Sequence, residues 1–342
     1  MKKLNIGYSI PNVNDATAFY RTIGPLSYFH KYCKHLYSGF NFEPVTSVSY
    51  AALSKFDVLL VQRPAVEAEL KLIEYAKKIP NLKIWVDYDD DVFCVPQENP
   101  AYELYAKAET KKVLARSLYL ADFITVSTDA LKAKFDSFLS KTDKKTGCFI
   151  SKNALPTHLL RPPSLKGPRE NLIVWRGGNS HVKDLMDYKS VIAQIQEEFP
   201  QYSWLFIGAK PWFLADVIPE KKLLFQPPLE ILEYFNMLNT IRPKVFFIPL
   251  SDNEFNHSKS NIAALEAFYS GATCIAPEKL KEFDTPGCFL MDQNNPMGAV
   301  RQALNQSDDE LDELSKIGLE YAPAIADKSI KLVEFISSDA SI

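Results

Sequence analysis

The sequence lacks several features that define whole classes of protein. Its five cysteines among 342 residues are scattered and form no Cys-x-x-Cys pair. This indicates a reducing compartment and predicts neither structural disulfides nor a zinc knuckle. No apolar run approaches the roughly 18 residues of a membrane span, and the N-terminus has no apolar signal core. We therefore expect a cytoplasmic protein without a transmembrane segment, or one in the host cytoplasm if the protein is viral.

An excess of charge of either sign is also missing. The chain carries 39 Lys and Arg against 42 Asp and Glu, a net charge of −3. This excludes a polycation of the histone kind, but not a local basic face. Residues 1–155 hold 21 basic and 17 acidic residues, a net +4, while residues 156–342 hold 18 and 25, a net −7. The asymmetry predicts two halves that face different partners.

Several catalytic signatures are absent as well. We find no Gly-x-Ser-x-Gly nucleophile elbow and no His-Glu-x-x-His zinc motif. The first expected strand ends Gly7-Tyr8-Ser9, without the glycine turn of a dinucleotide-binding domain. These absences argue against a serine hydrolase, a zinc protease and an NAD dehydrogenase.

What is present is an alternation of short apolar strands and amphipathic helices, which predicts an α/β fold with mainly parallel sheets. The expected strands of the first half read as buried on both faces, at Leu4–Ser9, Asp57–Gln62, Leu82–Asp87, Phe123–Ser127 and Cys148–Ser151. Those of the second half are Leu172–Arg176, Ser203–Gly208, Leu223–Phe225, Lys244–Pro249, Thr273–Ala276 and Cys288–Met291. The expected helices lie near Pro25–Lys34, Ala65–Lys78, Ala101–Leu120, Asp129–Leu139, Val182–Glu198, Leu229–Leu238, Ser260–Ser270, Met297–Leu304, Asp309–Tyr321 and Ala326–Ile336.

A proline-rich stretch interrupts this alternation. Residues 155–171 contain four prolines, Pro163 among them, and each proline fixes φ and removes a hydrogen-bond donor. We therefore expect two doubly wound, Rossmann-like domains, at residues 1–155 and 171–322, joined by a linker at 156–170. Ligands of such a fold belong at the carboxyl ends of the strands, in the cleft between the halves.

The most informative segment is VFFIPLSDNEFNHSKSNIAALEAFYSGATCIAP, from Val245 to Pro277. A buried strand is followed by a polar loop, and we expect the next helix to begin at Ser258, Lys259, Ser260 and Asn261. The amides of a helix N-terminus beside a lysine suit a phosphate or diphosphate. Glu266 lies two turns further along. From the residues alone, Glu266 is equally well explained as a solvated charge on a capped helix.

The same segment resembles the donor-binding motif of the group-1 (family 4) glycosyltransferases, which have the GT-B fold. The match is Leu265-Glu266-Ala267, then Gly271, then Cys274-Ile275-Ala276. The resemblance implies that Glu266 holds the ribose hydroxyls of a nucleotide sugar, and that the amides of 258–261 hold its diphosphate. The family often has a second glutamate eight residues upstream. Here Ser258 takes that position and Lys259 follows it, as in a Phe-Asn-x-x-Lys-Ser branch of such enzymes.

The resemblance also assigns roles to the domains. It implies that residues 1–155 bind the acceptor, that residues 171–322 bind the donor, and that the C-terminal helix in 323–342 crosses back to the first domain. It further implies sugar transfer with retention of configuration and without an essential metal. The co-substrate would be a UDP- or GDP-sugar, with no bound cofactor.

A second match covers Ile173–His181, which reads as a strand, a glycine turn and a helix start. Gly177 and Gly178 let the backbone approach a ligand closely, and Arg176 can fork onto phosphate oxygens. In the resembling family a basic residue at the end of this strand neutralises the leaving diphosphate, and Arg176 fits that position. His181 either contacts the donor or caps the helix.

An acidic stretch follows the strand that ends at Asp87. It carries four carboxylates in five residues, at Asp87, Asp89, Asp90 and Asp91. Such charges repel one another unless a cation, a cluster of donors or water relieves them. Three interpretations stay open: a metal-binding Asp-x-Asp motif, an acceptor-side or general-base role for Asp87 or Asp89, and a solvated loop. Many proteins that resemble this one carry a similar stretch in their acceptor domain, and our predicted site contains no metal.

Two further stretches of the first half are candidates for acceptor binding. The polar loop Ser9–Arg21 follows the first strand and is either an ordinary loop or an acceptor site formed by Asn14, Asp15, Thr17, Tyr20 and Arg21. The segment 132–152 is either a solvated face or a surface for an anionic acceptor, such as nucleic acid or a phosphorylated lipid-linked glycan. Its lysines are Lys132, Lys134, Lys141, Lys144, Lys145 and Lys152.

These observations predict a glycosyltransferase. Arg176 and Lys259 would offset the charge that grows on the leaving diphosphate. If the reaction inverts, Asp87 or Asp89 would be the base. The acceptor would be a glycan, a lipid-linked glycan or DNA. Two alternatives remain, a bacteriophage-type DNA sugar transferase that uses the basic face, and a non-catalytic nucleotide-sugar-binding or scaffold protein.

Overall fold

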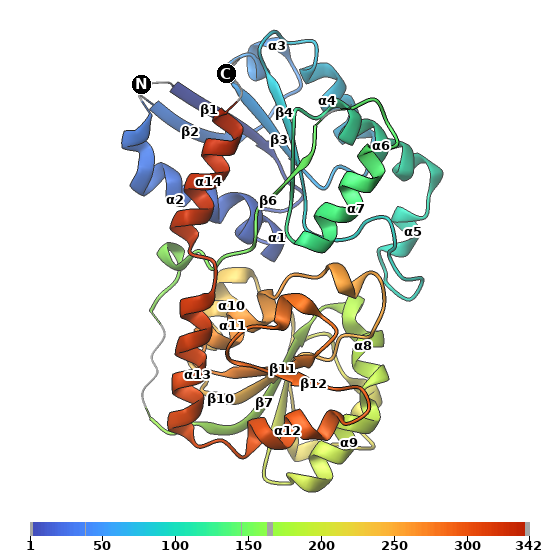
Figure 1. The fold of residues 1–342 in the computed structure, drawn as a ribbon, viewed down its shortest axis with the longest axis vertical. Helices are drawn as coiled ribbons and strands as arrows, with labels where there is room; N and C mark the ends of the chain where they lie inside the picture. Colours follow the sequence, from blue (N-terminus) through green and yellow to red (C-terminus); the bar gives the residue numbers. More distant parts are fainter. Residues whose placement is uncertain (1–2, 38, 145, 163–166, 339–342) are drawn as a thin grey trace. The chain divides into compact units, whose positions relative to one another are not determined.

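The computed structural model describes residues 3–37, 39–144, 146–162 and 167–338 (Figure 1). The chain divides into two compact units. Unit 1 comprises Met1–Val95, Ala101–His158 and Pro323–Ile342, and unit 2 comprises Pro96–Pro100 and Leu159–Ala322. Lys145 and Pro163, which entered the sequence predictions, lie outside the described residues. Within those residues, no helix is both long and apolar enough to cross a membrane.

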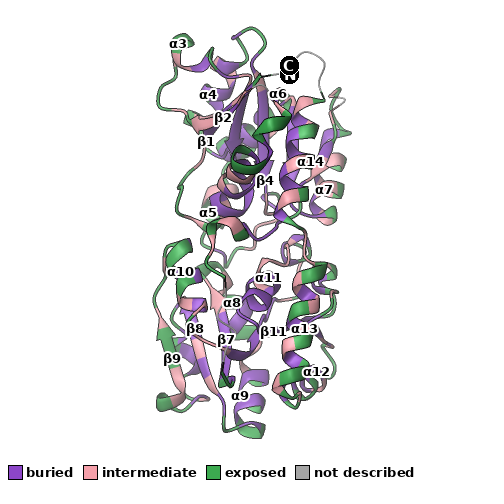
Figure 2. Ribbon diagram, turned by 90° about the vertical axis from the view of Figure 1, so that its left-hand side faces the viewer, coloured by how far each residue is buried: buried purple, intermediate pink, exposed green. Residues whose placement is uncertain are grey.

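Unit 1 is built on a six-stranded sheet in which all neighbouring strands are parallel. In the order β2-β1-β3-β4-β5-β6, its strands are β1 (Lys3–Ser9), β2 (Gly39–Pro44), β3 (Val58–Gln62), β4 (Lys83–Tyr88), β5 (Phe123–Val126) and β6 (Cys148–Ile150). Every residue of β3 is buried, and so is all of β4 after its first residue (Figure 2). The central strands therefore have helices on both faces.

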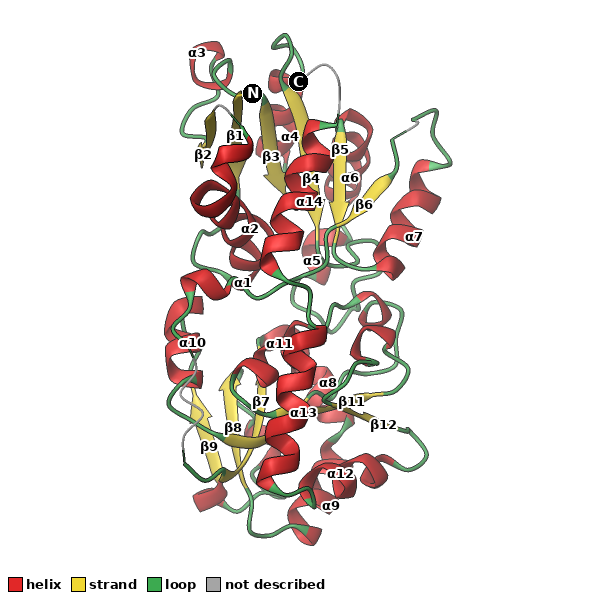
Figure 3. Cartoon of the chain, turned by 60° about the vertical axis from the view of Figure 1, so that its left-hand side comes forward, coloured by secondary structure: helices red, strands yellow, loops and turns green. Residues whose placement is uncertain are grey.

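The helices of unit 1 are α1 (Ala16–Ala18), α2 (Gly24–Tyr28), α3 (Tyr50–Leu53), α4 (Glu67–Ala76), α5 (Tyr102–Tyr105), α6 (Ala108–Leu120), α7 (Asp129–Leu139) and α14 (Ile325–Ser337) (Figure 3). One face of the sheet packs against α4, α6 and α7, through side chains such as Ile73, Leu118 and Phe135. The other face packs against α2 and α14, with Leu332 and Val333 among its buried residues. The predicted return of the C-terminal helix to the first domain is confirmed.

Two predictions for unit 1 were wrong. Strand β2 was not expected, because its sequence GFNFEP is only partly buried and contains Gly, Asn and Pro, which strands disfavour. The expected helix Ala101–Leu120 is two helices, α5 and α6, because Lys107 between them has an extended backbone (φ −64°, ψ 139°).

Unit 2 is built on a second parallel six-stranded sheet. In the order β12-β11-β10-β7-β8-β9, its strands are β7 (Glu170–Gly177), β8 (Ser203–Gly208), β9 (Leu223–Gln226), β10 (Pro243–Phe247), β11 (Thr273–Pro277) and β12 (Cys288–Met291). All six were expected. The two doubly wound parallel sheets confirm the predicted fold class of two Rossmann-like domains.

The helices of unit 2 are α8 (Val182–Asp187), α9 (Lys189–Glu198), α10 (Ile231–Leu238), α11 (Ile262–Tyr269), α12 (Pro296–Leu304) and α13 (Asp308–Tyr321). The expected single helix Val182–Glu198 breaks at Tyr188, whose backbone leaves the helical region (φ −97°, ψ 11°). Helix α11 ends at Tyr269, close to the expected end at Ser270, and Gly271 follows the cap residue. That glycine has φ +74°, and the amides of Gly271 and Ala272 donate to the carbonyls of Phe268 and Ala267, both at 2.9 Å.

Candidate functional site

The strand order of unit 2 contains a reversal. The chain runs from β7 outward to β8 and β9, then returns to β10 on the opposite side of β7. In an open parallel sheet, ligands bind outside the carboxyl ends of the strands at such a reversal. Most of the predicted donor residues follow β7 and β10, so the fold gathers them at this position.

Arg176 and Glu266 form an ion pair at the reversal. Arg176, near the end of β7, places its Nε 2.7 Å from Oε2 of Glu266 on α11. Tyr234 on α10 donates its hydroxyl hydrogen to the same carboxylate oxygen at 2.9 Å. The Glu266 side chain is 3% exposed, whereas that of Arg176 is 25% exposed. The guanidinium therefore presents a partly open edge, while the carboxylate beneath it is enclosed.

Tyr234 keeps its proton in this arrangement. Burial, followed by the charge of Glu266, raises the pKa of Tyr234 well above its ordinary value. A phenol that stays protonated can only add a hydrogen bond to the carboxylate. The Glu266 carboxyl group thus lies between a cation and a neutral donor, an arrangement suited to receiving further donors such as sugar hydroxyls.

The loop after β7 is fixed by close backbone packing. Gly208, at the end of β8, has φ +104°, and a Cβ added there would lie 2.3 Å from the carbonyl oxygen of Gly177. The amide of Ala209 donates to that same oxygen at 2.8 Å. A Cβ added at Gly178, in contrast, would meet no atom within 4 Å. The tight contact fixes the turn, and the space beside Gly178 is open.

His181 and Asp184 connect the two loops of the reversal. Nδ1 of His181 lies 2.9 Å from Oδ2 of Asp184, in the first turn of α8. Oδ1 of Asp184 accepts the backbone amide of Ser251 at 3.0 Å and the side-chain amide of Asn256 at 2.8 Å. Ser251 and Asn256 both follow β10. A single carboxylate, 6% exposed, therefore holds the β7 loop and the β10 loop together.

The β10 loop differs from the prediction in where its helix begins. Residues 256–258 form a single 3-10 turn, Lys259 has an extended backbone (φ −66°, ψ 140°), and α11 begins only at Ile262. The expected helix N-terminus at 258–261 is therefore wrong. Ser258 is 1% exposed, and Nζ of Lys259 lies 4.4 Å from the centre of the Phe255 ring. Ser260 and Asn261 precede the helix, and the Asn261 side chain does not cap it.

In unit 1, protein cations neutralise the acidic stretch after β4. Asp87 is paired with Arg21 through two hydrogen bonds, of 3.0 and 2.5 Å, and accepts the Thr125 hydroxyl. Asp89 and Asp90 lie 3.4 and 3.5 Å from the guanidinium of Arg63. These basic side chains, rather than solvent, relieve most of the repulsion that the sequence implied.

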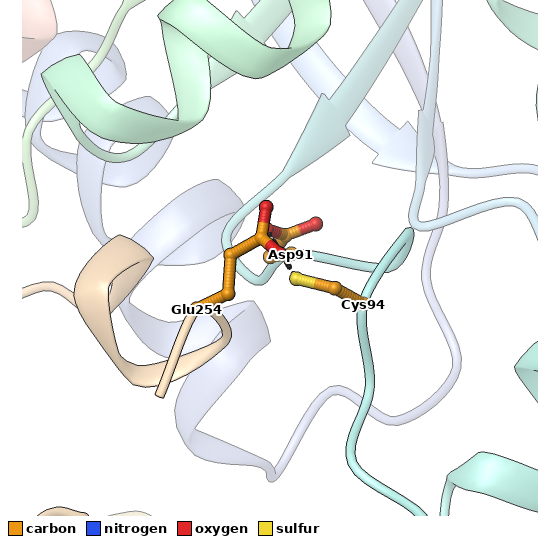
Figure 4. Close-up of side chains that lie close together, drawn as sticks. All are labelled: Asp91, Cys94 and Glu254. Carbon is orange, nitrogen blue, oxygen red and sulfur yellow. Dashed lines mark hydrogen bonds between the residues drawn. The ribbon is translucent and has the colours of Figure 1, made fainter. Parts of the chain in front are cut away.

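Asp91 completes this pattern. It accepts hydrogen bonds from Lys134 and from the amide of Phe93 at 3.1 Å. It also accepts one from the thiol of Cys94 at 2.8 Å (Figure 4). Burial and then the Asp91 carboxylate raise the pKa of Cys94 to about 12, so the thiol keeps its proton. Glu254, which the figure also draws, belongs to unit 2 and is not part of this loop.

The two candidate bases, Asp87 and Asp89, have different surroundings. Asp87 is 1% exposed and its oxygens are occupied by Arg21 and Thr125. The Asp89 side chain is 14% exposed. Burial raises the pKa of Asp89, an effect that Arg63 opposes and Asp90 reinforces. Asp89 is thus the more accessible carboxylate of the two.

Arg63 is a residue that the sequence analysis missed. It follows β3 directly, at the β1/β3 reversal of the unit 1 sheet, and its backbone has φ +48°, which is unusual for a residue with a side chain. Its Nη2 lies 3.2 Å from Oγ1 of Thr17. A basic residue directly after a fully buried strand was the available signal, but its acidic partners became visible only in the fold.

The five predicted acceptor residues separate into two groups. Tyr20 and Arg21 are 0% and 2% exposed and lie in a π-helical turn, so the expectation that they belong to an open loop is wrong. The others lie at or near the surface: Thr17 contacts Arg63, Asp15 caps α1 by accepting the amide of Ala18 at 2.7 Å, and Asn14 is exposed.

The predicted basic face is largely paired within unit 1. Lys132 contacts Asp136, Lys134 contacts Asp91, and Lys152 lies 3.4 Å from Asp129. Lys144 donates to the backbone carbonyls of Tyr119 and Ala121, and its burial lowers its pKa. The lysine run therefore presents less unpaired positive charge than its sequence suggests.

No protein-family model and no curated protein sequence matches the chain. Solved structures do. An α-glucosyltransferase in complex with UDP and a 13-mer DNA containing a central A:G mismatch is similar with a TM-score of 0.64 and 14% identity, over 98% of this chain and 100% of that one. A pneumococcal O-GlcNAc transferase in complex with UDP and GlcNAc is similar with a TM-score of 0.54 and 12% identity, over 84% of this chain and 59% of that one.

An enzyme of a different reaction class is similar as well. The UDP-GlcNAc 2-epimerase of Neisseria meningitidis, bound to UDP-GlcNAc, has a TM-score of 0.55 and 11% identity, over 99% of this chain and 100% of that one. At these identities the likeness concerns the fold. Together with the two parallel six-stranded sheets, it identifies the fold of this protein as GT-B.

Proposed function

We propose that this protein transfers a sugar from a nucleoside diphosphate sugar to an acceptor. The observation that carries the proposal is the Arg176–Glu266–Tyr234 cluster at the strand reversal of unit 2. An enclosed carboxylate can accept the two ribose hydroxyls, and the partly exposed guanidinium beside it can contact the diphosphate. The proposal draws further support from the structures of similar fold, which contain UDP or UDP-GlcNAc.

The reaction would break the bond between the anomeric carbon and the diphosphate oxygen and form one between the anomeric carbon and the acceptor atom, whose proton would pass to the departing diphosphate. Negative charge then grows on the diphosphate, and Arg176 and Lys259 would offset it. We propose retention of configuration, as the motif resemblance implies. We also propose that no metal is essential, because protein cations can supply this electrostatic term. Should the reaction invert, Asp89 would be the base, since Asp87 is enclosed by Arg21 and Thr125.

The donor role is tested by replacing Glu266 with alanine. Thermal-shift screening against UDP-, GDP-, ADP- and CMP-sugars first selects the donor, because a specific ligand stabilises the folded state by mass action. We expect Glu266→Ala to lower the affinity for the selected sugar nucleotide about 10- to 100-fold in calorimetry, since charged hydrogen bonds are lost. Glu320→Gln, an exposed position of α13 in the same unit, should bind normally. Full-strength binding by the Glu266 variant would show that the site lies elsewhere.

DNA is a second candidate acceptor, because one structure of similar fold is a glucosyltransferase bound to DNA. Transfer of labelled sugar to duplex DNA should then fall steeply with salt concentration.

Incubation with UDP-GlcNAc and no acceptor tests for epimerisation, which the epimerase of similar fold makes worth measuring. Absence of any turnover of the selected sugar nucleotide would leave the non-catalytic binding protein as the remaining interpretation.

A further inference from the structure

The starting point is the hydrogen-bonding state of His181. Its Nδ1 is 2.9 Å from Asp184, and within the described chain no hydrogen bond to its Nε2 is formed. The His181 side chain is 20% exposed. One ring nitrogen is thus fixed by an enclosed carboxylate, and the other is available at the same strand reversal as Arg176 and Glu266.

The surroundings determine which ring nitrogen carries the proton. Burial by itself would raise the pKa of Asp184, but hydrogen bonds from His181, Ser251 and Asn256 lower it. Asp184 is therefore a carboxylate and can only accept. Nδ1 of His181 must then be the protonated nitrogen, which leaves the Nε2 lone pair as an acceptor when the ring is neutral.

The charges that face His181 favour the neutral ring. Burial lowers the pKa of His181, its hydrogen bond to Asp184 raises it, and the charges of Lys259 and Arg176 lower it, with a net decrease. Lys259 lies in the loop after β10 and Arg176 lies near the end of β7, so the two cations come from both sides of the reversal. At neutral pH the site then combines two cations with one neutral hydrogen-bond acceptor.

A neutral imidazole with an open lone pair recognises a different chemical group from its cationic neighbours. Its unprotonated Nε2 cannot donate to a phosphate oxygen, but it can accept a hydrogen bond from a hydroxyl group. We propose that Nε2 of His181 accepts a hydrogen bond from a hydroxyl of the transferred sugar, and that Asp184 is a positioning residue that fixes the required tautomer. This inference rests on the proposed function and names the part of the donor that His181 recognises.

Asp184 would act at once on the two loops that follow β7 and β10. The carboxylate that orients His181 also holds Ser251 and Asn256 of the β10 loop. Loss of this carboxylate would free the β10 loop and also allow the ring to carry its proton on Nε2. An Asp184 variant should therefore reproduce the His181 defect even though the imidazole is still present.

The decisive experiment compares the affinity for the sugar nucleotide with the affinity for the matching free nucleoside diphosphate. The ligands are UDP-glucose and UDP, or the pair that the screen selects. In calorimetry we expect His181→Phe to lower the affinity for the sugar nucleotide on the order of tenfold. The free diphosphate should bind as in the unmodified protein. His30→Phe is the control, since His30 also has one bonded ring nitrogen but lies in unit 1.

The tautomer is tested with Asp184→Asn. This variant should also lose affinity for the sugar nucleotide, and adding His181→Phe to it should cause little further loss, because the two residues act through one contact. Nitrogen-15 NMR of the imidazole should show the proton on Nδ1 in the unmodified protein and on Nε2 in Asp184→Asn. The affinity for the sugar nucleotide would not change in these variants if the pair only capped α8, whereas the NMR signals report the tautomer itself.

The pH dependence follows from the same argument. Protonation of the ring removes the acceptor, so affinity for the sugar nucleotide should be constant at neutral pH. It should fall as the pH drops below about 6.5, the ordinary histidine pKa, since the pKa of His181 is lowered from there. In His181→Phe this decline should be absent.

The outcomes separate the two proposals. Equal weakening of sugar nucleotide and free diphosphate by His181→Phe would overturn the sugar contact, as would unchanged affinity for both. In either case, a strong defect in Glu266→Ala would leave the proposed function standing. Failure of Glu266→Ala to weaken binding would instead overturn the donor site itself.

Discussion

Arg21 and Asp87 place opposite charges in the interior of unit 1, with side chains that are 1% and 2% exposed. Arg21 also donates to the backbone carbonyl of Ser151 and to the side chain of Asn153. The guanidinium therefore connects β4 with the segment that follows β6. Buried charges are tolerated only when they are paired and fully hydrogen-bonded, and this pair meets both conditions.

We expect Arg21→Met to lower the free energy of unfolding by about 3–5 kcal/mol, because it leaves the Asp87 carboxylate buried without its cation. Urea denaturation measures the loss. The double variant Arg21→Met/Asp87→Leu should recover part of it, since both charges are then gone. Lys55→Met, which breaks an exposed pair with Glu43, should leave the midpoint unchanged. An Arg21 variant as stable as the unmodified protein would show that the pair does not stabilise the fold.

At the scale of elements, the ends of β7 and β8 determine how the donor loop leaves the sheet. The backbone of Gly208 is in the left-handed region, and its α-carbon faces the Gly177 carbonyl oxygen, so a side chain has no room there. Gly178, one residue further along the β7 loop, has open space and an extended backbone (φ −81°, ψ −175°). Two glycines near one loop therefore have different functions.

Gly208→Ala should destabilise unit 2 by at least about 1–3 kcal/mol through backbone strain, and it should also weaken sugar-nucleotide binding because the β7 loop must move. Gly178→Ala should keep its thermal stability. Any loss of affinity in Gly178→Ala then reports on the ligand itself. Thermal melts and calorimetry on both variants make the comparison. Equal stability of the two variants would contradict this account.

At the scale of the whole molecule, the last helices of the chain serve different units. Leu311 of α13 is buried in the core of unit 2, whereas Leu332 of α14 is buried in the core of unit 1, beside Leu4 and Trp85. The chain passes from one unit to the other after Ala322. Unit 1 therefore contains both ends of the sequence and depends on its last helix.

Leu311→Ala and Leu332→Ala should each lower the free energy of unfolding by about 2–5 kcal/mol, because each leaves a cavity in a packed core. Hydrogen-exchange mass spectrometry should locate the effects in different units. Exchange should increase in β7, β10 and β11 for Leu311→Ala, and in β1, β3 and β4 for Leu332→Ala. If Leu332→Ala increased exchange in β10 and β11 instead, the assignment of α14 to unit 1 would be wrong.

Much of this fold could be predicted from the sequence, for a local reason. Most strands of the two sheets are short apolar runs bounded by polar turns, so all six strands of unit 2 and all but β2 of unit 1 were expected. The edge strand β2 lacks that signal. Arg176 and Glu266 were also singled out from the sequence, through a motif resemblance. The start of α11 was misplaced by four residues, since Ser258 to Asn261 resemble a helix start but adopt a turn and an extended stretch.

The sequence by itself determined which segments become strands and helices, because periodicity and turn residues act between neighbours along the chain. Only the tertiary structure decided which charged and polar side chains meet. Asp87 pairs with Arg21 across 66 positions, Tyr234 reaches Glu266 across 32, and Asp184 reaches Asn256 across 72. These contacts depend on the order of strands in each sheet, which composition and spacing do not specify. The five cysteines and the small net charge excluded whole classes of protein, but the candidate donor site is formed only where the strand reversal of unit 2 brings the loops after β7 and β10 together.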